Sequence, residues 1–261
     1  RGREADSLEK QLARQVKTKI HFHSKRSYEE LLEEFTHVVL ATGDGAYAQE
    51  LRNYRTDLTV TLKGAMVEGN FDRYAVAAWL DYRFAPKGYG YFIPHSDTEA
   101  NIVIAYPDYP ETDVLDIDQL WHMFHERASA DLKQKLKITD RFQITRQIIG
   151  ICRYPRIGNT FFTGNCFGAI MPFLGFGQYP AILTGIYAAL DLCGKGSYEK
   201  LTAHLRDSYQ TALTLRRGLE KLDNAKLDKL VKAMDTDTAE AMFNSRHNFL
   251  KAAGMLLGPF I

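Results

Sequence analysis

Residues 159–178, NTFFTGNCFGAIMPFLGFGQ, are the stretch that decides the fold. A short apolar run leads into the pair Gly164-Asn165, a turn of small residues and a Gly-x-Gly turn, and a long helix is expected after them. The marked positions are Gly164, Asn165, Pro172, Gly175, Phe176, Gly177 and Gln178. Glycine has no Cβ, so the backbone can approach a ligand closely, and a helix N-terminus presents backbone N–H groups to it. The stretch predicts a strand, a ligand-facing turn and a helix.

The residues before this stretch predict the trailing part of an α/β layer. Apolar positions in residues 6–17 recur at i, i+4 and i+8, with Asp6 or Ser7 as N-cap, which is typical of an amphipathic helix. Residues 19–23 are expected to form a strand. Residues 36–43 form a β-branched apolar run that ends in glycine, as a buried strand of a parallel sheet does.

The middle of the chain changes to period two, which predicts an antiparallel sheet. The alternating segments are residues 58–62, 74–84, 89–93 and 101–106, and residues 141–152 are also expected to be extended. Helices are expected at residues 116–136, from 178 onward, at 198–222 and at 238–257. The predicted class is a mixed α/β (α+β) fold with a partial Rossmann-like layer (1–56 and 153–195), an antiparallel-sheet layer (57–152) and a C-terminal helical region (196–261).

Composition excludes several classes of function. The 33 basic and 32 acidic residues give a net charge of +1, so no basic surface for nucleic acid is expected. The three cysteines have no CxxC spacing, which argues against a disulfide framework or a zinc site and favours a reducing cytoplasm. No run approaches the roughly 20 apolar residues that span a bilayer. The chain begins with Arg1 rather than methionine, which is expected of a cut sequence.

Taken together, these segments resemble the flavoprotein group that includes the geranylgeranyl reductases and, more distantly, the p-hydroxybenzoate hydroxylase type. The resemblance covers essentially the whole chain and is strongest at residues 159–178. It implies an FAD site at the glycine turns, with the helix N-terminus against the pyrimidine side of the flavin. The implied cofactor residues are Arg3, Ala41, Thr42, Gly43, Gly164, Asn165, Pro172, Gly175, Phe176, Gly177 and Gln178.

One position of the motif departs from the family, in which an aspartate holds the ribityl hydroxyls. Asn165 stands there instead, and its amide can bond a hydroxyl but supplies no charge-assisted bond. Weaker flavin affinity or altered chemistry is the expected consequence. The neighbouring Cys166 is expected to be an inert packing residue.

Residues 88–94, GYGYFIP, are similar to the reductase hairpin that lines an isoprenoid cavity. The resemblance implies Tyr89, Tyr91 and Pro94 as substrate residues and a prenyl lipid, held by burial and shape, as substrate. The family usually has tryptophan at Tyr91 and phenylalanine at Ile93, and its later glycines are Val103 and Ala105 in this chain.

The GxGxxG fingerprint that binds the ADP pyrophosphate is absent from the sequence. In the family it lies upstream, so the sequence is expected to be a truncated record or a fragment that holds FAD weakly. A chain limited to these residues would expose the edge of the strand at 38–41, and we expect it to aggregate or self-associate and to purify without flavin.

No catalytic acid or base can be assigned, and His122, His125 and Glu126 are expected to form a polar helix face rather than a metal site. The leading hypothesis is a flavin-dependent reductase of prenyl C=C bonds that uses NAD(P)H or a ferredoxin-type electron donor, with peripheral membrane contact possible. The alternatives are a flavin-dependent monooxygenase and a non-catalytic lipid-binding or partner-binding fragment.

Overall fold

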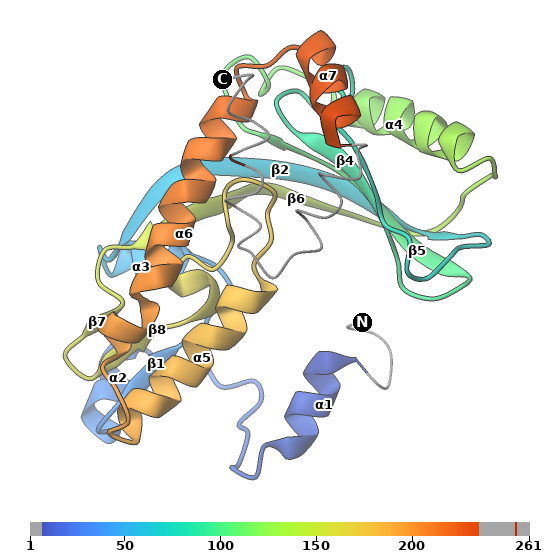
Figure 1. Cartoon of the computed structure of the whole chain (residues 1–261). Helices are drawn as coiled ribbons and strands as arrows, with labels where there is room; N and C mark the ends of the chain where they lie inside the picture. Colours follow the sequence, from blue (N-terminus) through green and yellow to red (C-terminus); the bar gives the residue numbers. More distant parts are fainter. Residues whose placement is uncertain (1–6, 235–253, 255–261) are drawn as a thin grey trace. The chain divides into compact units, whose positions relative to one another are not determined.

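The computed structural model of the chain describes residues 7–234 and Gly254 (Figure 1). The chain divides into two compact units, Arg1–Val38 and Val39–Ile261. The predicted helix at 238–257 lies outside the described residues apart from Gly254, and so does Arg3. The three-part division expected from the sequence stays a prediction.

The first unit contains two short helices with sequence-encoded caps. Helix α1 spans Leu8–Gln15, and the Ser7 hydroxyl accepts a bond from the Lys10 backbone N–H at its start. Helix α2 spans Tyr28–Glu34 and begins with a capping box between Ser27 and Glu30. Neither helix contains a buried residue.

The strand predicted at residues 19–23 is wrong, because this segment is a loop. Its alternating apolar residues are not buried in a core: Ile20 is 49% exposed and Phe22 is 78% exposed. An extended segment becomes a strand only when a neighbour accepts its backbone hydrogen bonds, and among the described residues none pairs with it.

The predicted antiparallel sheet is present in the second unit, with the strand order β3-β4-β5-β2-β6. The strands are β2 (Tyr54–Glu68), β3 (Ala77–Trp79), β4 (Tyr89–Pro94), β5 (Glu99–Pro107) and β6 (Lys137–Cys152). The long strands β2 and β6 curve through the second unit (Figure 1), and their pairing contains three register shifts. Such irregularities bend a strand and increase its twist.

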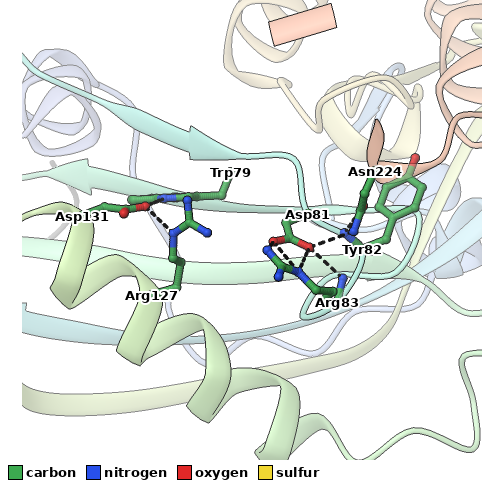
Figure 2. Close-up of polar contacts among 7 residues, drawn as sticks. All are labelled: Trp79, Asp81, Tyr82, Arg83, Arg127, Asp131 and Asn224. Atoms are coloured by element: carbon green, nitrogen blue, oxygen red, sulfur yellow. Dashed lines mark hydrogen bonds and ion pairs between the residues drawn. The ribbon is translucent and has the colours of Figure 1, made fainter. Parts of the chain in front are cut away.

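The extended segment predicted at residues 74–84 is mostly wrong, because only Ala77–Trp79 forms a strand. Asp81 starts a turn, since its side chain accepts the Arg83 backbone N–H at 3.0 Å. It also accepts a bond from the Asn224 amide, and Asn224 in turn accepts the Tyr82 backbone N–H (Figure 2). These local side-chain bonds replace the ladder that a longer strand would need.

Helix α4, Ile117–Asp131, covers one face of the sheet. Its N-cap is Asp116, and its Asp131 carboxylate accepts bonds from Trp79 and Arg127, both at 2.7 Å (Figure 2). The helix ends before the predicted residue 136, because Lys133 adopts a left-handed conformation that breaks the helical path. Beneath the helix lies a core of aromatic and branched residues, which includes Trp121, Phe124, Ala128, Val67, Phe92, Ile102 and Ile104.

A second sheet contains β1 (Val38–Leu40), β8 (Thr160–Phe162) and β7 (Arg156–Ile157) in the order β1-β8-β7. Within the described residues β1 therefore has one neighbour and lies at the edge. Val38 and Leu40 are buried and Val39 is 44% exposed, because alternate side chains of β1 face opposite sides and, within the described residues, only one side is covered.

The remaining helices of the second unit are α3 (Ala46–Glu50), a 3-10 turn (Gly164–Cys166), α5 (Gln178–Leu192), α6 (Tyr198–Leu219) and α7 (Asn224–Met234). The predicted starts of α5 at Gln178 and α6 at Tyr198 are confirmed. Helices α6 and α7 contribute Tyr209, Leu213, Leu219 and Leu227 to a second core with Ile149 and Ile151 of β6. This core and the candidate site both lie on the sheet face that α4 does not cover.

Candidate functional site

A cavity of about 160 Å³ lies between the sheet, the residues before α5 and helix α6. Its walls are mostly apolar. They consist of Val60, Leu62, Tyr89, Tyr91, Ala105, Tyr106, Gln147, Ile149, Ile170, Met171, Pro172, Gly175 and Arg216. The cavity thus brings together two segments that the sequence singled out separately, the aromatic hairpin at 88–94 and the glycine turn at 172–177.

The alternation of strand β4 explains which aromatic residues face the cavity. Gly90 packs against Phe124 of α4, where an added Cβ would lie 2.3 Å from the ring. Successive side chains of a strand point to opposite faces, so Tyr89 and Tyr91 face the cavity. Pro94 shares the parity of Gly90 and does not line the cavity.

Tyr89 joins the hairpin to the glycine turn. Its hydroxyl donates a bond of 2.6 Å to the Leu174 carbonyl, and its ring centroid lies 5.7 Å from that of Tyr91. Burial raises the pKa of both tyrosines above the ordinary value of 10.0, so both keep their protons at neutral pH. The Tyr89 proton is used on the Leu174 carbonyl, whereas the protonated Tyr91 hydroxyl is a potential donor at the cavity.

The turn that precedes α5 is closed by its own backbone. Gly175 donates to the Met171 carbonyl at 3.0 Å, and Met171 donates to the Phe176 carbonyl at 2.9 Å. Gly175 has a φ of 67°, which favours glycine, and an added Cβ would lie 3.4 Å from the Tyr89 hydroxyl. Pro172 and Gly175 line the cavity, whereas the Phe176 side chain is 63% exposed.

Helix α5 begins at Gln178, with Gly177 as its N-cap and no side-chain hydrogen bond to its first turn. The first backbone N–H groups of a helix have no partner within the helix. In the described structure they are left for water or for a ligand. An added Cβ at Gly177 would approach the Ala169 carbonyl to 3.3 Å, which is a tight contact.

The predicted residues Gly164 and Asn165 lie beside the segment that follows β1. Gly164 has a φ of 57°, and its carbonyl accepts bonds from the N–H groups of Phe167, Gly168 and Ala169. The Asn165 side chain donates a bond of 2.6 Å to the Gly43 carbonyl, across 122 residues of sequence. The Gly164-Asn165 pair and the segment that follows β1 therefore form one local structure.

Thr42 and Cys166 lie side by side in this local structure. The Thr42 hydroxyl is 2.8 Å from the fully buried Cys166 sulfur, which also donates to the Asp44 carbonyl at 3.3 Å. Ala41, Thr42 and Gly43 are exposed, and the Gly43 carbonyl accepts the Asn165 bond.

Sequence reasoning missed Arg216, which is 5% exposed and lines the cavity. It forms an ion pair with Glu220 and donates a bond of 2.7 Å to the Lys87 carbonyl. The signal that could have found it is its position in α6, where an arginine interrupts the buried stripe formed by Tyr209, Ala212, Leu213 and Leu219.

Two further features concern metals and membranes. The exposed side chains of His122 and Glu126 lie 3.3 Å apart on α4, and within residues 7–234 no cluster of three potential metal ligands occurs. In the same part of the chain, no helix has the length and apolar character that crossing a bilayer requires.

The comparisons with known proteins show the fold. No protein-family model matches the chain, and no curated protein matches its sequence significantly. A geranylgeranyl bacteriochlorophyll reductase-like protein from Thermoplasma acidophilum aligns over 84% of this chain with a TM-score of 0.61 and 17% identity. A flavoprotein/dehydrogenase from Cytophaga hutchinsonii (82% of this chain, TM-score 0.58, 13% identity) and a flavin-dependent brominase (84%, 0.53, 14%) are also similar.

At these identities the likeness establishes the fold alone. The mixed α/β fold predicted from the sequence is confirmed, and two of the three similar structures are described as a flavoprotein/dehydrogenase and a flavin-dependent brominase. The chain spans 62% of the length of the reductase-like protein and 57% of the length of each of the other two.

Proposed function

We propose that the chain forms the flavin-ring side and the substrate side of an FAD-dependent oxidoreductase. The observation that carries the proposal is the shared cavity, in which Pro172 and Gly175 of the glycine turn lie opposite Tyr89 and Tyr91 of the hairpin. An apolar cavity with a few convergent polar groups is the usual form of a small-molecule site. The fold shared with flavoproteins is consistent with this cofactor.

The residues at the glycine turns fit such a cofactor. Gly175 keeps the backbone close to the cavity, and the N-terminus of α5 offers backbone N–H groups that no side chain caps. Asn165 uses its amide N–H on the Gly43 carbonyl, which leaves its Oδ1 free to accept a bond from a ribityl hydroxyl. Bound FAD would supply hydride-transfer chemistry, and the protein residues would position the substrate and exclude water.

The finer proposal is the reduction of C=C bonds in a prenyl or isoprenoid lipid. It is supported by the apolar walls formed by Val60, Leu62, Ile149 and Ile170, which stabilise an apolar chain by about 25 cal/mol per Å² of buried surface. A cavity of about 160 Å³ encloses one segment of such a lipid rather than its full length. NAD(P)H or a ferredoxin-type protein is the proposed electron donor.

A second candidate is a flavin-dependent monooxygenase, and the size of the cavity favours it. An engineered cavity of about 150 Å³ binds benzene, so the present cavity of about 160 Å³ suits a single ring. Hydroxylation of a ring and reduction of a double bond would both use an apolar cavity that faces the glycine turn.

The test is to express the chain together with any coding sequence upstream of Arg1 and to record its absorption spectrum. We expect a flavin spectrum and, with an isoprenoid and a reduced electron donor, a product that has gained two hydrogens. A product that has gained one oxygen would identify the monooxygenase. A protein that stays colourless when FAD is added would contradict both candidates and favour a non-catalytic binding protein.

A further inference from the structure

Arg216 places a buried cation in the wall of an otherwise apolar cavity. Its side chain is 6% exposed, and it reaches the cavity from helix α6. Two of its N–H groups are used, one on Nε toward Glu220 and one on Nη2 toward the Lys87 carbonyl. A guanidinium has five N–H donors, and the others have no partner among the described residues.

The charge of Arg216 is already balanced. One Glu220 oxygen accepts from Arg216, and the other accepts the Tyr109 hydroxyl at 2.8 Å. Burial and the bond to Glu220 raise the pKa of Tyr109 to about 12, so this hydroxyl stays a donor at neutral pH. Both oxygens of the carboxylate are thus engaged, and the pair is neutral as a whole.

A neutral ion pair with unused donors has a definite ligand preference. Burying an unpaired charge is unfavourable, and a carboxylate that entered beside Glu220 would find no free cation to compensate it, because Glu220 already balances Arg216. A carbonyl oxygen would accept an unused N–H bond without adding a charge. An apolar group at the same place would cover these donors and offer them no bond.

We propose that the cavity binds an apolar molecule that carries one neutral hydrogen-bond acceptor, a carbonyl oxygen, and that Arg216 recognises this oxygen. The volume of about 160 Å³ fits one ring or a short branched segment beside it. Tyr89, Tyr91 and the aliphatic walls surround the apolar part. Binding of this ligand does not depend on the proposed function, because the protein alone forms the cavity. Calling the ligand a substrate does rest on the proposed function.

The experiment compares three probes of the same size on the full chain without added flavin. Acetophenone carries a carbonyl, α-methylstyrene replaces this oxygen with a methylene group, and benzoate carries a carboxylate. Dissociation constants are measured by ligand-observed NMR titration. We expect acetophenone to bind about tenfold more tightly than α-methylstyrene, which is the effect of one hydrogen bond to a charged donor, and also more tightly than benzoate.

The variant Arg216→Met/Glu220→Gln removes both charges and keeps an acceptor for Tyr109. It should bind acetophenone and α-methylstyrene equally. Arg206→Met is the matched control, because Arg206 lies on the same helix and donates to the Cys152 carbonyl at 2.8 Å but does not line the cavity. It should keep the preference. Circular dichroism and the melting temperature show whether each variant folds.

A measurement on the unaltered chain covers the case of a variant that does not fold. With ¹⁵N-labelled arginine, acetophenone should shift the Arg216 side-chain resonance, and α-methylstyrene should not. Equal binding of the two probes, or a preference that survives in the double variant, would overturn the proposal. Tighter binding of benzoate than of acetophenone would overturn the proposal that the acceptor is uncharged. A chain that fails to take up flavin but keeps the acetophenone preference would contradict the proposed function alone.

Discussion

At the scale of single residues, Gly175 offers a direct test of the cavity. Its φ of 67° disfavours any side chain, and a Cβ would contact the Tyr89 hydroxyl. We expect Gly175→Val to lower the free energy of unfolding by about 1–2 kcal/mol through backbone strain. The valine should also abolish binding of acetophenone, because its methyl groups enter the cavity. Urea denaturation and NMR titration measure the two effects.

Gly194 provides the matched control for this prediction. It follows α5, has the same φ of 67°, and a Cβ there would meet nothing within 4 Å. Gly194→Val should therefore lose a similar free energy of unfolding but keep the affinity for the probe. Equal probe affinity in both variants would mean that Gly175 does not shape the cavity.

Arg216 and Asn165 show why single residues of the site are hard to predict from sequence. The motif at 164–178 marked Asn165, but its bond to the Gly43 carbonyl depends on a partner 122 positions away. Arg216 carries no motif at all, and its role depends on Glu220 and on the Lys87 carbonyl, 129 positions away. Local spacing identifies the turn, whereas the partners of its side chains are set by tertiary packing.

At the scale of elements, periodicity predicted those helices and strands that have one covered face. Helix α6 starts at the predicted residue because its apolar stripe has a core to cover, and β4 alternates between α4 and the cavity. The segment at 19–23 has the same alternation but no neighbouring strand. The turn at Asp81 depends on Asn224 of α7, which no local pattern could reveal.

The Asp81 turn predicts a pH dependence of stability. Burial alone would raise the pKa of Asp81, but the hydrogen bonds and charge of Arg83 outweigh burial and hold it below the ordinary 3.8. A carboxyl with a lowered pKa stabilises the folded state fully above its unfolded pKa, and this contribution is lost as the pH falls through the folded pKa. The turn should therefore weaken below about pH 4.

We expect Asp81→Asn to lower the free energy of unfolding at pH 7 by up to about 1 kcal/mol, since Arg83 is largely exposed. The difference from the unaltered chain should shrink as the pH falls below about 4 and the Asp81 carboxyl takes up a proton. Asp72→Asn is the control, because Asp72 accepts the Tyr74 backbone N–H at 2.9 Å in a similar turn, without an ion pair among the described contacts. Urea denaturation from pH 7 downward measures this difference in the free energy of unfolding. A difference that does not shrink at low pH would show that it does not come from the charge of Asp81.

At the scale of the whole molecule, the two compact units differ in what holds their helices. In the second unit α7 is only 11 residues long, but it buries Leu227 and Leu230 in the core with α6 and β6. In the first unit α1 has 8 residues, α2 has 7, and neither buries a side chain. Helices shorter than about 12–15 residues are marginal in water unless tertiary packing supports them.

This difference predicts the order in which the chain opens. In hydrogen exchange followed by mass spectrometry, the amides of α1 and α2 should exchange nearly as fast as those of an unfolded chain, because caps alone contribute about 1 kcal/mol each. Those of α7 should be protected to a degree close to those of β5, although α7 is also short, because Leu227 and Leu230 must leave the core before the helix can open.

Ser7→Ala, which removes the cap of α1, should change no exchange rate outside the first unit. Strong protection of α1 would mean that its apolar residues Leu8 and Leu12, which are 43% and 49% exposed in the structure, are covered in solution, and would contradict this prediction.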